Sequence, residues 1–244
     1  MATSDIIRQL QRDILPLQGF KPPSRGERVD IGLPALEAAF PQAVFPTGAV
    51  HEFISSTRED MAAAHGFVAG LLGHLMRTEG ICIWVSTART VFPPALTNFG
   101  ISPDRVIFID CSSEHDLLWA VEEALTCEGL ASVVGEVRDI DFTTSRRLQL
   151  AVEKSRVTGF LLRHQPRRLG TVACVTRWRI APLASQWEDD MPGVGFPRWQ
   201  VELLKIRNGK PGTWVVEWAE GRFREAQRHE AQNEREPLRI VQTG

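Results

Sequence analysis

The sequence predicts an α/β fold with a mostly parallel central sheet, helices on both faces of the sheet, and antiparallel strands at its C-terminal end. Between residues 48 and 223, short runs of β-branched residues alternate with longer segments of helical period. This alternation is the rhythm of βαβ units, which build parallel sheets. After residue 159 one strand-like segment follows another, so the last strands are expected to run antiparallel.

The elements can be placed along the chain by their patterns. Five strands of the parallel part are predicted at residues 49–54, 81–86, 105–109, 132–137 and 159–163. Helices are predicted in the gaps, one of them starting near Glu59 and another covering 143–156. The helix at 113–127 has the clearest pattern, because its apolar residues share one face and Ser113 with Asp116 forms a capping box. Three further strands are predicted at 171–180, 198–206 and 213–218, with a turn at 208–212.

The chain is expected to fold around one core with modest additions, because 244 residues slightly exceed the roughly 100–200 residues of a typical domain. We predict an N-terminal arm or helical segment at 1–46, a core at 47–224 and a charged, flexible tail at 225–244. The arm carries an apolar stripe that consists of Ile6, Ile7, Leu10, Ile14, Leu15 and Leu17. The stripe is expected to pack on the chain's own core or on a neighbouring subunit, which leaves a homo-oligomer open.

The composition excludes several classes of protein. With 28 Lys and Arg against 30 Asp and Glu, the chain as a whole has no general attraction for nucleic acid or anionic membranes. The four cysteines form no C-x-x-C pair, so neither a disulfide framework nor a zinc site is predicted, and reduced, buried thiols are expected. The longest stretch without charged residues, 61–76, is shorter than the roughly 20 apolar residues of a membrane span. With no signal-peptide pattern at the N-terminus, we expect a cytoplasmic protein without a membrane partner.

The loop after the first predicted strand lacks what a phosphate-binding loop needs. Such a loop surrounds phosphates with glycine-rich backbone and a lysine. Here it consists of Ser55, Ser56, Thr57, Arg58, Glu59 and Asp60, without glycine or lysine. None of the four lysines lies between residues 22 and 153, so no shifted alignment supplies the missing lysine. The sequence therefore predicts a degenerate nucleotide loop, with no catalytic residues, no ATP hydrolysis and no cofactor.

Four segments, in this order along the chain, resemble the RecA-like core. They read FPTGAVHEF at 45–53, ICIWVS at 81–86, PPALTNFGISPDRVIFI at 93–109 and ASVVGEV at 131–137. More closely, the chain resembles the ImuA family, whose RecA-like members belong to a damage-inducible mutagenesis cassette. The resemblance covers residues 46–224 and rests on the ordered series of segments. It implies a RecA-like core for the predicted α/β fold.

The resemblance also marks the positions where an active RecA-type ATPase has its catalytic groups. Thr87, Ala88 and Arg89 follow the second strand, where a catalytic glutamate would be expected. Gly135 stands where the metal-coordinating aspartate would be. Glu136 is adjacent, but its side chain is expected to point to the other face of the strand. Together with the loop, these differences imply a scaffold that has lost its chemistry.

What the resemblance implies about function is participation in translesion DNA synthesis during the SOS response. Proteins similar to this one act with ImuB, a Y-family polymerase-like protein without catalysis, and with an error-prone DnaE-type polymerase. We therefore expect a non-catalytic scaffold that binds an ImuB-like partner and the DnaE-type polymerase complex. Two alternatives remain open. One is a divergent, ATP-dependent, recombinase-like ATPase that binds DNA, and the other is a SulA-like inhibitor of cell division.

Basic residues are concentrated in one part of the chain. Residues 138–179 hold ten Lys and Arg against three Asp and Glu, a net charge of +7, whereas the rest of the chain has 18 against 27, a net charge of −9. Candidate contacts to single-stranded DNA are Arg146, Arg147 and Lys154 on the helix at 143–156, and Arg163, Arg167 and Arg168 in the loop after it. By resemblance this loop corresponds to a shortened DNA-contacting loop of RecA proteins. Trp178 or Trp199 would offer faces for base stacking.

Each of these candidates also has a structural interpretation. The arginines can form a solvated or partner-facing surface, and the tryptophans can pack in the sheet. The six histidines are too scattered for a metal site, so none is predicted. Asp139 and Asp141 would either bind a cation or lie in a solvated loop before a helix. Gly66, Gly70 and Gly73 are expected to allow close packing of their helix on the sheet.

Overall fold

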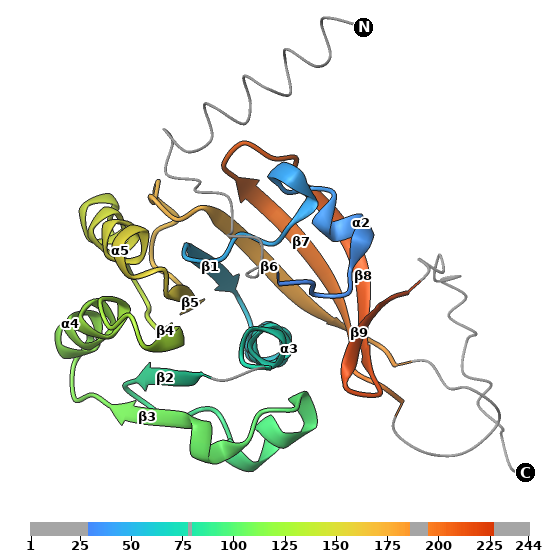
Figure 1. Cartoon of the computed structure of the whole chain (residues 1–244), viewed down its shortest axis with the longest axis horizontal. Coiled ribbons are helices and arrows are strands. Elements are labelled where there is room, and N and C mark those ends of the chain that lie inside the picture. The colour runs from blue at the N-terminus through green and yellow to red at the C-terminus, as the bar shows by residue number, and fades with distance from the viewer. Residues whose placement is uncertain (1–28, 78–79, 186–194, 227–244) are drawn as a thin grey trace, which may run out of the picture.

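The computed structural model describes residues 29–77, 80–185 and 195–226. Within them, nine strands form one sheet in the order β3-β2-β4-β5-β1-β6-β7-β8-β9, as Figure 1 shows. The strands are β1 Val50–Ser55, β2 Ile81–Ser86, β3 Val106–Asp110, β4 Leu130–Glu136, β5 Thr158–His164, β6 Thr176–Leu183, β7 Arg198–Ile206, β8 Gly212–Ala219 and β9 Arg222–Glu225. Neighbours from β3 to β6 in this order run parallel, and those from β6 to β9 run antiparallel. The predicted mixed sheet is confirmed.

Helices cover both faces of the parallel part of the sheet. Helix α3 (Arg58–Leu75) lies on one face, and α4 (Glu114–Leu125) and α5 (Phe142–Ser155) lie on the other (Figure 1). The short helix α2 (Pro34–Glu37) and three 3-10 helices, η1 (Pro41–Ala43), η2 (Pro93–Phe99) and η3 (Pro103–Arg105), complete the described elements. None of the helices in the described ranges is long and apolar enough to cross a membrane.

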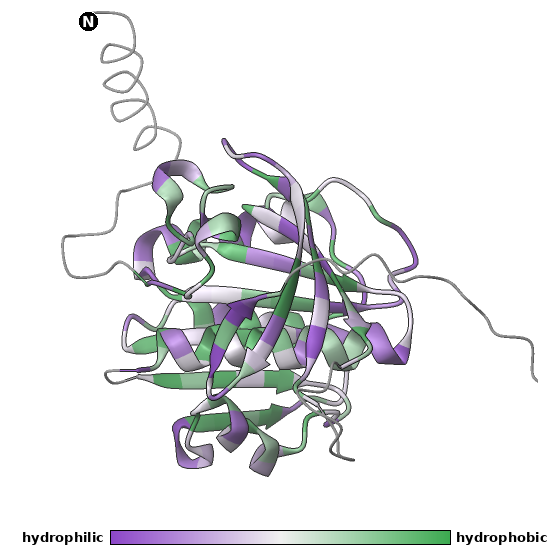
Figure 2. Cartoon of the chain, turned by 90° about the vertical axis from the view of Figure 1, so that its right-hand side faces the viewer, coloured by the Kyte–Doolittle hydropathy of each residue, from purple (hydrophilic) through white to green (hydrophobic). Residues whose placement is uncertain are grey.

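The sheet separates two hydrophobic clusters. The larger one fills the space between the sheet and α3 and includes Phe53, Trp84 and Trp178. The smaller one lies under α4 and α5 and includes Val121, Val133 and Leu148. Figure 2 shows hydrophobic residues following the inner strands, with hydrophilic residues on the outer elements. Because consecutive side chains of a strand alternate between the faces, each parallel strand contributes to both clusters.

The described part of the predicted N-terminal segment packs into the larger cluster. Ile31, Leu33, Leu36, Phe40 and Phe45 are all buried there. The core therefore extends at least to Ile31 and reaches beyond the predicted boundary at residue 46. At the other end, β9 includes Glu225, the first residue of the predicted tail. The apolar stripe of residues 6–17 and the rest of the tail lie outside the described residues.

The helix caps follow the sequence signals. Thr57 accepts a hydrogen bond from the backbone N–H of Asp60 at the start of α3, at 3.1 Å. Ser113 accepts one from Asp116 N–H at 3.1 Å, as the predicted capping box requires. Each cap satisfies one backbone N–H that the helix itself leaves without a partner. The strands begin and end within two residues of the predicted positions, with two exceptions. Strand β6 (predicted at 171–180) begins at Thr176 and ends at Leu183, and β9 was not predicted.

The three glycines of α3 allow the close packing expected of them. A Cβ atom added at Gly70 would lie 2.4 Å from the ring of Phe223 on β9, and one at Gly73 would lie 2.3 Å from the carbonyl oxygen of Phe99. At Gly66 the nearest atom, 3.0 Å away, belongs to Trp199 on β7. Two of these glycines therefore lie against side chains of the antiparallel strands β7 and β9. Gly73 lies against the backbone of η2, where a side chain on the helix would collide with the Phe99 carbonyl oxygen.

Candidate functional site

The connection between β1 and α3 lies where a RecA-type phosphate loop would lie, and it is very short. Only Ser56 and Thr57 separate the last residue of the strand from the first residue of the helix. Two backbone N–H groups at the start of α3 are hydrogen-bonded by neighbouring side chains. Thr57 Oγ1 accepts from Asp60 N–H at 3.1 Å, and the Asp60 carboxylate accepts from Ser56 N–H at 3.4 Å. The carboxylates of Glu59 and Asp60 already supply negative charge at the positive end of the helix dipole.

The remaining residues of this loop do not form an anion site either. Ser55 is buried, and its hydroxyl group donates to the carbonyl oxygen of Arg163 at 3.3 Å. Arg58 and Glu59 are exposed on the helix. The predicted loop is therefore a tight, capped turn, in which side chains of the turn itself occupy the backbone N–H groups of Ser56 and Asp60.

A carboxylate stands beside this turn at the end of β4. The Glu136 carboxylate accepts hydrogen bonds from Trp84 Nε1 at 2.8 Å and from Thr90 Oγ1 at 3.0 and 2.9 Å. His65 on α3 places its Nε2 atom 3.1 Å from the same carboxylate, and its Nδ1 atom lies 2.7 Å from the carbonyl oxygen of Met61. Side chains from β2, from α3 and from the loop after β2 thus surround this carboxylate.

The structure confirms that Gly135 and Glu136 face opposite sides of the strand, as expected. A Cβ atom at Gly135 would lie 2.7 Å from a methyl group of Val121 on α4, so a side chain there would enter the smaller cluster. Glu136 points to the opposite face, where α3 lies. Strand alternation explains the difference, because Val134 belongs to the α3 side and Val133 to the α4 side. One carboxylate thus lies on the α3 side of the sheet, and three neighbouring side chains hold it.

The hollow beside Glu136 is small. Its volume is about 150 Å³, and Ser55, His65, Thr87, Thr90, Glu136 and His164 are among the residues that line it. Sites for drug-sized ligands usually measure about 300–1,000 Å³. In this conformation the hollow is therefore too small for a nucleoside triphosphate.

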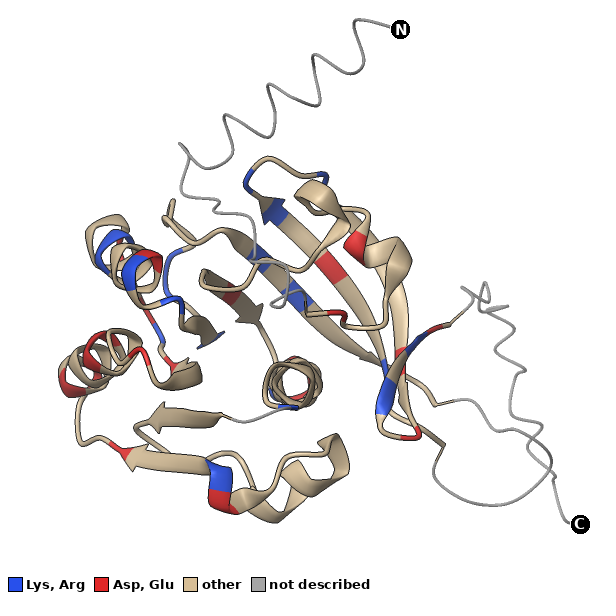
Figure 3. Ribbon diagram, viewed as in Figure 1, with Lys and Arg blue, Asp and Glu red and all other residues tan. Residues whose placement is uncertain are grey.

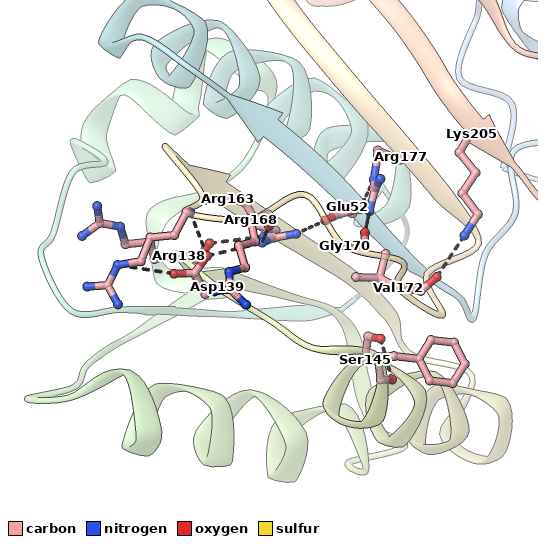
Figure 4. Close-up of polar contacts among 12 residues, drawn as sticks. Glu52, Arg138, Asp139, Ser145, Arg163, Arg168, Gly170, Val172, Arg177 and Lys205 are labelled. Atoms are coloured by element: carbon pink, nitrogen blue, oxygen red, sulfur yellow. Dashed lines mark hydrogen bonds and ion pairs between the residues drawn. The ribbon is translucent and has the colours of Figure 1, made fainter.

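A buried ion-pair network lies on the other side of β1. The Glu52 carboxylate pairs with the Arg163 guanidinium from β5 and with Arg177 Nε from β6 at 2.5 Å. Glu52 is fully buried and Arg163 is 1% exposed. Figure 4 shows the three side chains meeting between the strands. A buried carboxylate needs such partners, because an unpaired charge in the interior costs several kcal/mol.

Arg163 was therefore wrongly predicted as a DNA contact. Its guanidinium is enclosed by Glu52, by the carbonyl oxygen of Arg138 at 3.3 Å and by that of Arg168 at 3.1 Å. The strand β5 extends to His164, so Arg163 is a strand residue that faces inward, not the first residue of a loop. Glu52, a carboxylate inside an apolar strand, was the signal in the sequence that cationic neighbours would be needed.

Basic side chains also fasten the loop between β5 and β6 to the sheet. Arg177 Nη2 donates to the carbonyl oxygen of Gly170 at 2.7 Å, and Lys205 Nζ to that of Val172 at 2.9 Å (Figure 4). On the other side, the Asp139 carboxylate accepts from the backbone N–H of Arg167 at 2.9 Å. Much of the positive charge in this part of the chain thus stabilises a loop conformation.

Three cations remain exposed at this edge of the sheet. Arg167, with a side chain that is 74% exposed, and Arg168 lie in the loop after β5, and Arg138 lies in the loop after β4. The hydrogen bond between Asp139 and the Arg167 backbone holds the two loops side by side. Arg138 was not among the predicted DNA contacts. Arg138 directly follows the strand predicted at 132–137, and the neighbouring strand β5 leads into the basic loop. This position could have identified Arg138 as a candidate from the sequence.

The basic residues of α5 form a separate surface. Arg146, Arg147 and Lys154 are exposed on the helix, as predicted. However, Arg147 pairs with Glu122 of α4, its Nε lying 2.9 Å from the carboxylate, and Arg146 lies 3.9 Å from Glu153. Figure 3 shows basic residues of α5 beside acidic residues of α4. Among these three residues, Lys154 has no ion pair within the described part of the chain.

The predicted stacking residues are not accessible. Trp178 and Trp199 are buried in the larger cluster, where both lie against Phe67. The structural interpretation of these two tryptophans is therefore correct. A base cannot reach Trp178 without opening the core, and only 5% of Trp199 is exposed.

The other candidates have structural roles. Asp141 caps α5 by accepting from Thr144 N–H at 2.7 Å, and Asp139 binds the basic loop. His51 is buried, and burial lowers the pKa of its imidazole to about 4. Among the described residues, no group of three or more His, Cys, Asp or Glu side chains is placed to hold a metal ion. All four cysteines are free; Cys82 and Cys174 are buried, whereas Cys127 is exposed.

Two curated proteins are similar to this chain over most of its length. Both are named Protein ImuA, and they come from Caulobacter vibrioides strains NA1000/CB15N and ATCC 19089/CIP 103742/CB 15. Each is 35% identical to this chain over 201 residues, which is 78% of this chain and 82% of the relative. No family model matches the chain.

Solved structures share the fold. The crystal structure of the RadB recombinase superposes with a TM-score of 0.50 and 13% identity, covering 74% of this chain and 92% of that chain. This likeness shows that the fold is RecA-like. The structure of SulA from Pseudomonas aeruginosa has a TM-score of 0.41 and 14% identity, and covers 47% of this chain and 97% of that chain. A likeness at that level does not bear on fold or function.

Proposed function

Because this chain belongs to the ImuA family and has a RecA-like fold, we propose that it is a non-catalytic accessory protein of a translesion DNA synthesis complex. Its work is binding: it would hold an ImuB-type polymerase-like partner and an error-prone DnaE-type polymerase at damaged DNA. The observation that carries the non-catalytic part is the capped, two-residue connection between β1 and α3.

Three features of the site support binding without turnover. The turn has no glycine to bring its backbone around an anion and no lysine to reach a phosphate. Its first-turn carboxylates repel a triphosphate. The carboxylate of Glu136, which lies next to the position of the metal-coordinating aspartate, is engaged by Trp84, Thr90 and His65.

Calorimetry tests the non-catalytic part. The full chain is titrated with ATP in the presence of magnesium, and an active RecA-type ATPase is titrated under the same conditions as a positive control. We expect no heat of binding for this chain at micromolar ATP. Micromolar binding, together with release of phosphate, would instead support the divergent ATPase. The observation that favours this rival is Glu136, which faces the α3 side of the sheet.

A pull-down tests the partner assignment. The tagged chain is recovered from cells with and without DNA damage, and the bound proteins are identified. We expect an ImuB-type protein and a DnaE-type polymerase in the damaged sample. Recovery of a tubulin-like division protein in their place would support the SulA-like alternative and contradict the proposal.

The proposal includes DNA contact at the loops after β4 and β5, with Arg138 taking the place of Arg163 in the predicted set. Arg138, Arg167 and Arg168 are exposed, lie on adjoining loops and include two members of the predicted set. They lie at the carboxyl ends of β4 and β5, the edge at which open α/β sheets usually bind ligands. Phosphate contacts from exposed arginines would position single-stranded DNA without reading its sequence.

A further inference from the structure

An open apolar groove runs beside the small hollow at Glu136. It lies between the N-terminal half of α3, η2 and the adjoining ends of β6 and β7, and its volume is about 690 Å³. Ala62, Gly66, Ala69, Phe92, Ala95 and Trp199 are among its lining residues. This volume lies within the range of about 300–1,000 Å³ that is usual for ligand sites. The small residues of α3 and η2 leave the space, and the aromatic residues provide its walls.

The rim of the groove exposes large apolar side chains to water. Phe92 is 70% exposed and Leu183 is 38% exposed, and both line the groove. Phe196, 42% exposed, immediately precedes the lining residue Pro197. Exposed aromatic and aliphatic side chains gathered around a concave apolar surface are typical of sites where another protein binds.

The guanidinium of one lining residue is incompletely hydrogen-bonded within the described part of the chain. Arg198 at the start of β7 is 7% exposed, and its Nε atom is buried without a hydrogen-bond acceptor. No carboxylate of the described residues forms an ion pair with it, although Glu217 lies directly opposite on β8. A buried guanidinium without an anion is costly, and an acid brought by an occupant of the groove would complete its hydrogen bonds.

We propose that this groove binds a segment of a partner protein in which a carboxylate lies next to at least two apolar side chains. The apolar side chains fill the space between α3 and η2, and the carboxylate pairs with Arg198. The proposal rests on the scaffold function and deepens it, because it assigns a surface and a chemistry to partner binding. Both a short amphipathic helix and an extended peptide fit this description, since each can place apolar anchors in a groove.

Selection of peptides tests the proposal without knowledge of the partner. A phage-displayed library of random 12-residue peptides is selected on the full chain, and the selected sequences are synthesised with a fluorescent label. We expect them to share two or more apolar residues and an Asp or Glu. Binding is then measured by fluorescence polarisation for the wild type and for four variants that change the groove or lie outside it.

The variants separate the effect of the Arg198 charge on peptide binding from the effect of the space in the groove and from nonspecific effects of substitution. Arg198→Met is expected to weaken binding at least tenfold, and the same loss is expected when the peptide's acid is replaced by its amide. Combining the two changes should add little further, because each removes the same pair. Ala95→Phe, which fills the groove, is expected to abolish binding, and Ala62→Trp to weaken it. Arg179→Met, a matched change of an exposed arginine on β6 that does not line the groove, should stay within twofold of the wild type.

Several results would overturn the proposal. These are selected peptides without an acid, equal binding to Arg198→Met and wild type, or equal binding to Ala95→Phe and wild type. A concentration-dependent dimer that Ala95→Phe abolishes would identify a second copy as the occupant, and stronger peptide binding after removal of residues 227–244 would identify the chain's own tail. The peptide-binding assay contains no polymerase component. If peptides bind the groove but the pull-down recovers no polymerase protein, the translesion function is contradicted and the groove proposal stands.

Discussion

The Glu52 carboxylate on β1 and the Arg163 guanidinium on β5 form a fully buried ion pair in the centre of the sheet. Arg177 from β6 reaches the same carboxylate from the other side. One acid thus ties together the three strands β5, β1 and β6, and the side chain of Arg163 continues to the backbone of the basic loop. Four predictions follow from this network and from the features around it.

Removing one member of the buried pair is expected to destabilise the protein strongly. Arg163→Met leaves Glu52 with only Arg177, and we expect a loss of about 3–5 kcal/mol in the free energy of unfolding, because a buried charge loses its partner. Urea unfolding measures the loss. Arg167→Met in the same loop is the matched control and should change stability by no more than about 0.5 kcal/mol, since its side chain is exposed. Equal stability of the two variants would contradict the network's role.

Stability is expected to fall as the solution is acidified below pH 6.5. Burial lowers the pKa of His51 in the folded state to about 4 from its ordinary value of 6.5, so between these values the unfolded chain binds a proton that the folded chain does not. The contribution is present above pH 6.5 and is lost towards pH 4, at most about 3 kcal/mol. His51→Gln should remove this part of the pH dependence, whereas His115→Gln, at an exposed position, should keep it. An NMR titration that finds His51 protonated at pH 6 would refute the assignment.

Close packing of α3 is expected to tolerate no side chain at Gly73. A methyl group there would lie 2.3 Å from the Phe99 carbonyl oxygen, a backbone atom that cannot rotate away, so Gly73→Ala should cost about 1–3 kcal/mol. Thermal unfolding shows this as a lower Tm. Gly129→Ala is the control, because no atom lies within 4 Å of the added carbon. A Tm for Gly73→Ala at or above that of the control would mean that η2 does not lie this close in solution.

Single-stranded DNA is expected to bind at the loop edge. Arg138→Ala and the double variant Arg167→Ala with Arg168→Ala should each weaken binding. For each lost phosphate contact, the slope of log affinity against log salt should fall by about 0.7. Electrophoretic mobility shifts at several salt concentrations provide both values. Arg179→Ala, an exposed arginine paired with Glu202, should have no effect. If the loop variants bind like the wild type, the three arginines do not contact DNA.

Most of the fold was predictable because its signals are local. Ser113 with Asp116, and Thr57 before α3, mark helix starts by hydrogen bonds within one turn. The strand β9 was missed because it has four residues and lies within a charged sequence. Its signal was the turn at Glu220 and Gly221, both with positive φ, which is typical of a two-residue hairpin.

The site was less predictable because it depends on contacts far apart in the sequence. Arg163 and Glu52 are 111 residues apart, and only the strand order shows that β5 and β1 are neighbours. A basic residue in a candidate loop looks the same in the sequence whether it faces solvent or a buried acid. Strand alternation correctly separates Gly135 from Glu136, but it does not say which of the two faces α3 covers.

The direct passage from β1 into α3 bears on how a chain with the proposed non-catalytic function could acquire a Walker-type phosphate loop. The Walker motif G-x-x-x-x-G-K-[ST] occupies roughly eight positions, far more than the pair of residues available between this strand and its helix. Point mutations alone cannot make that room. An insertion would have to come first, and it would displace Thr57, whose side chain caps the helix.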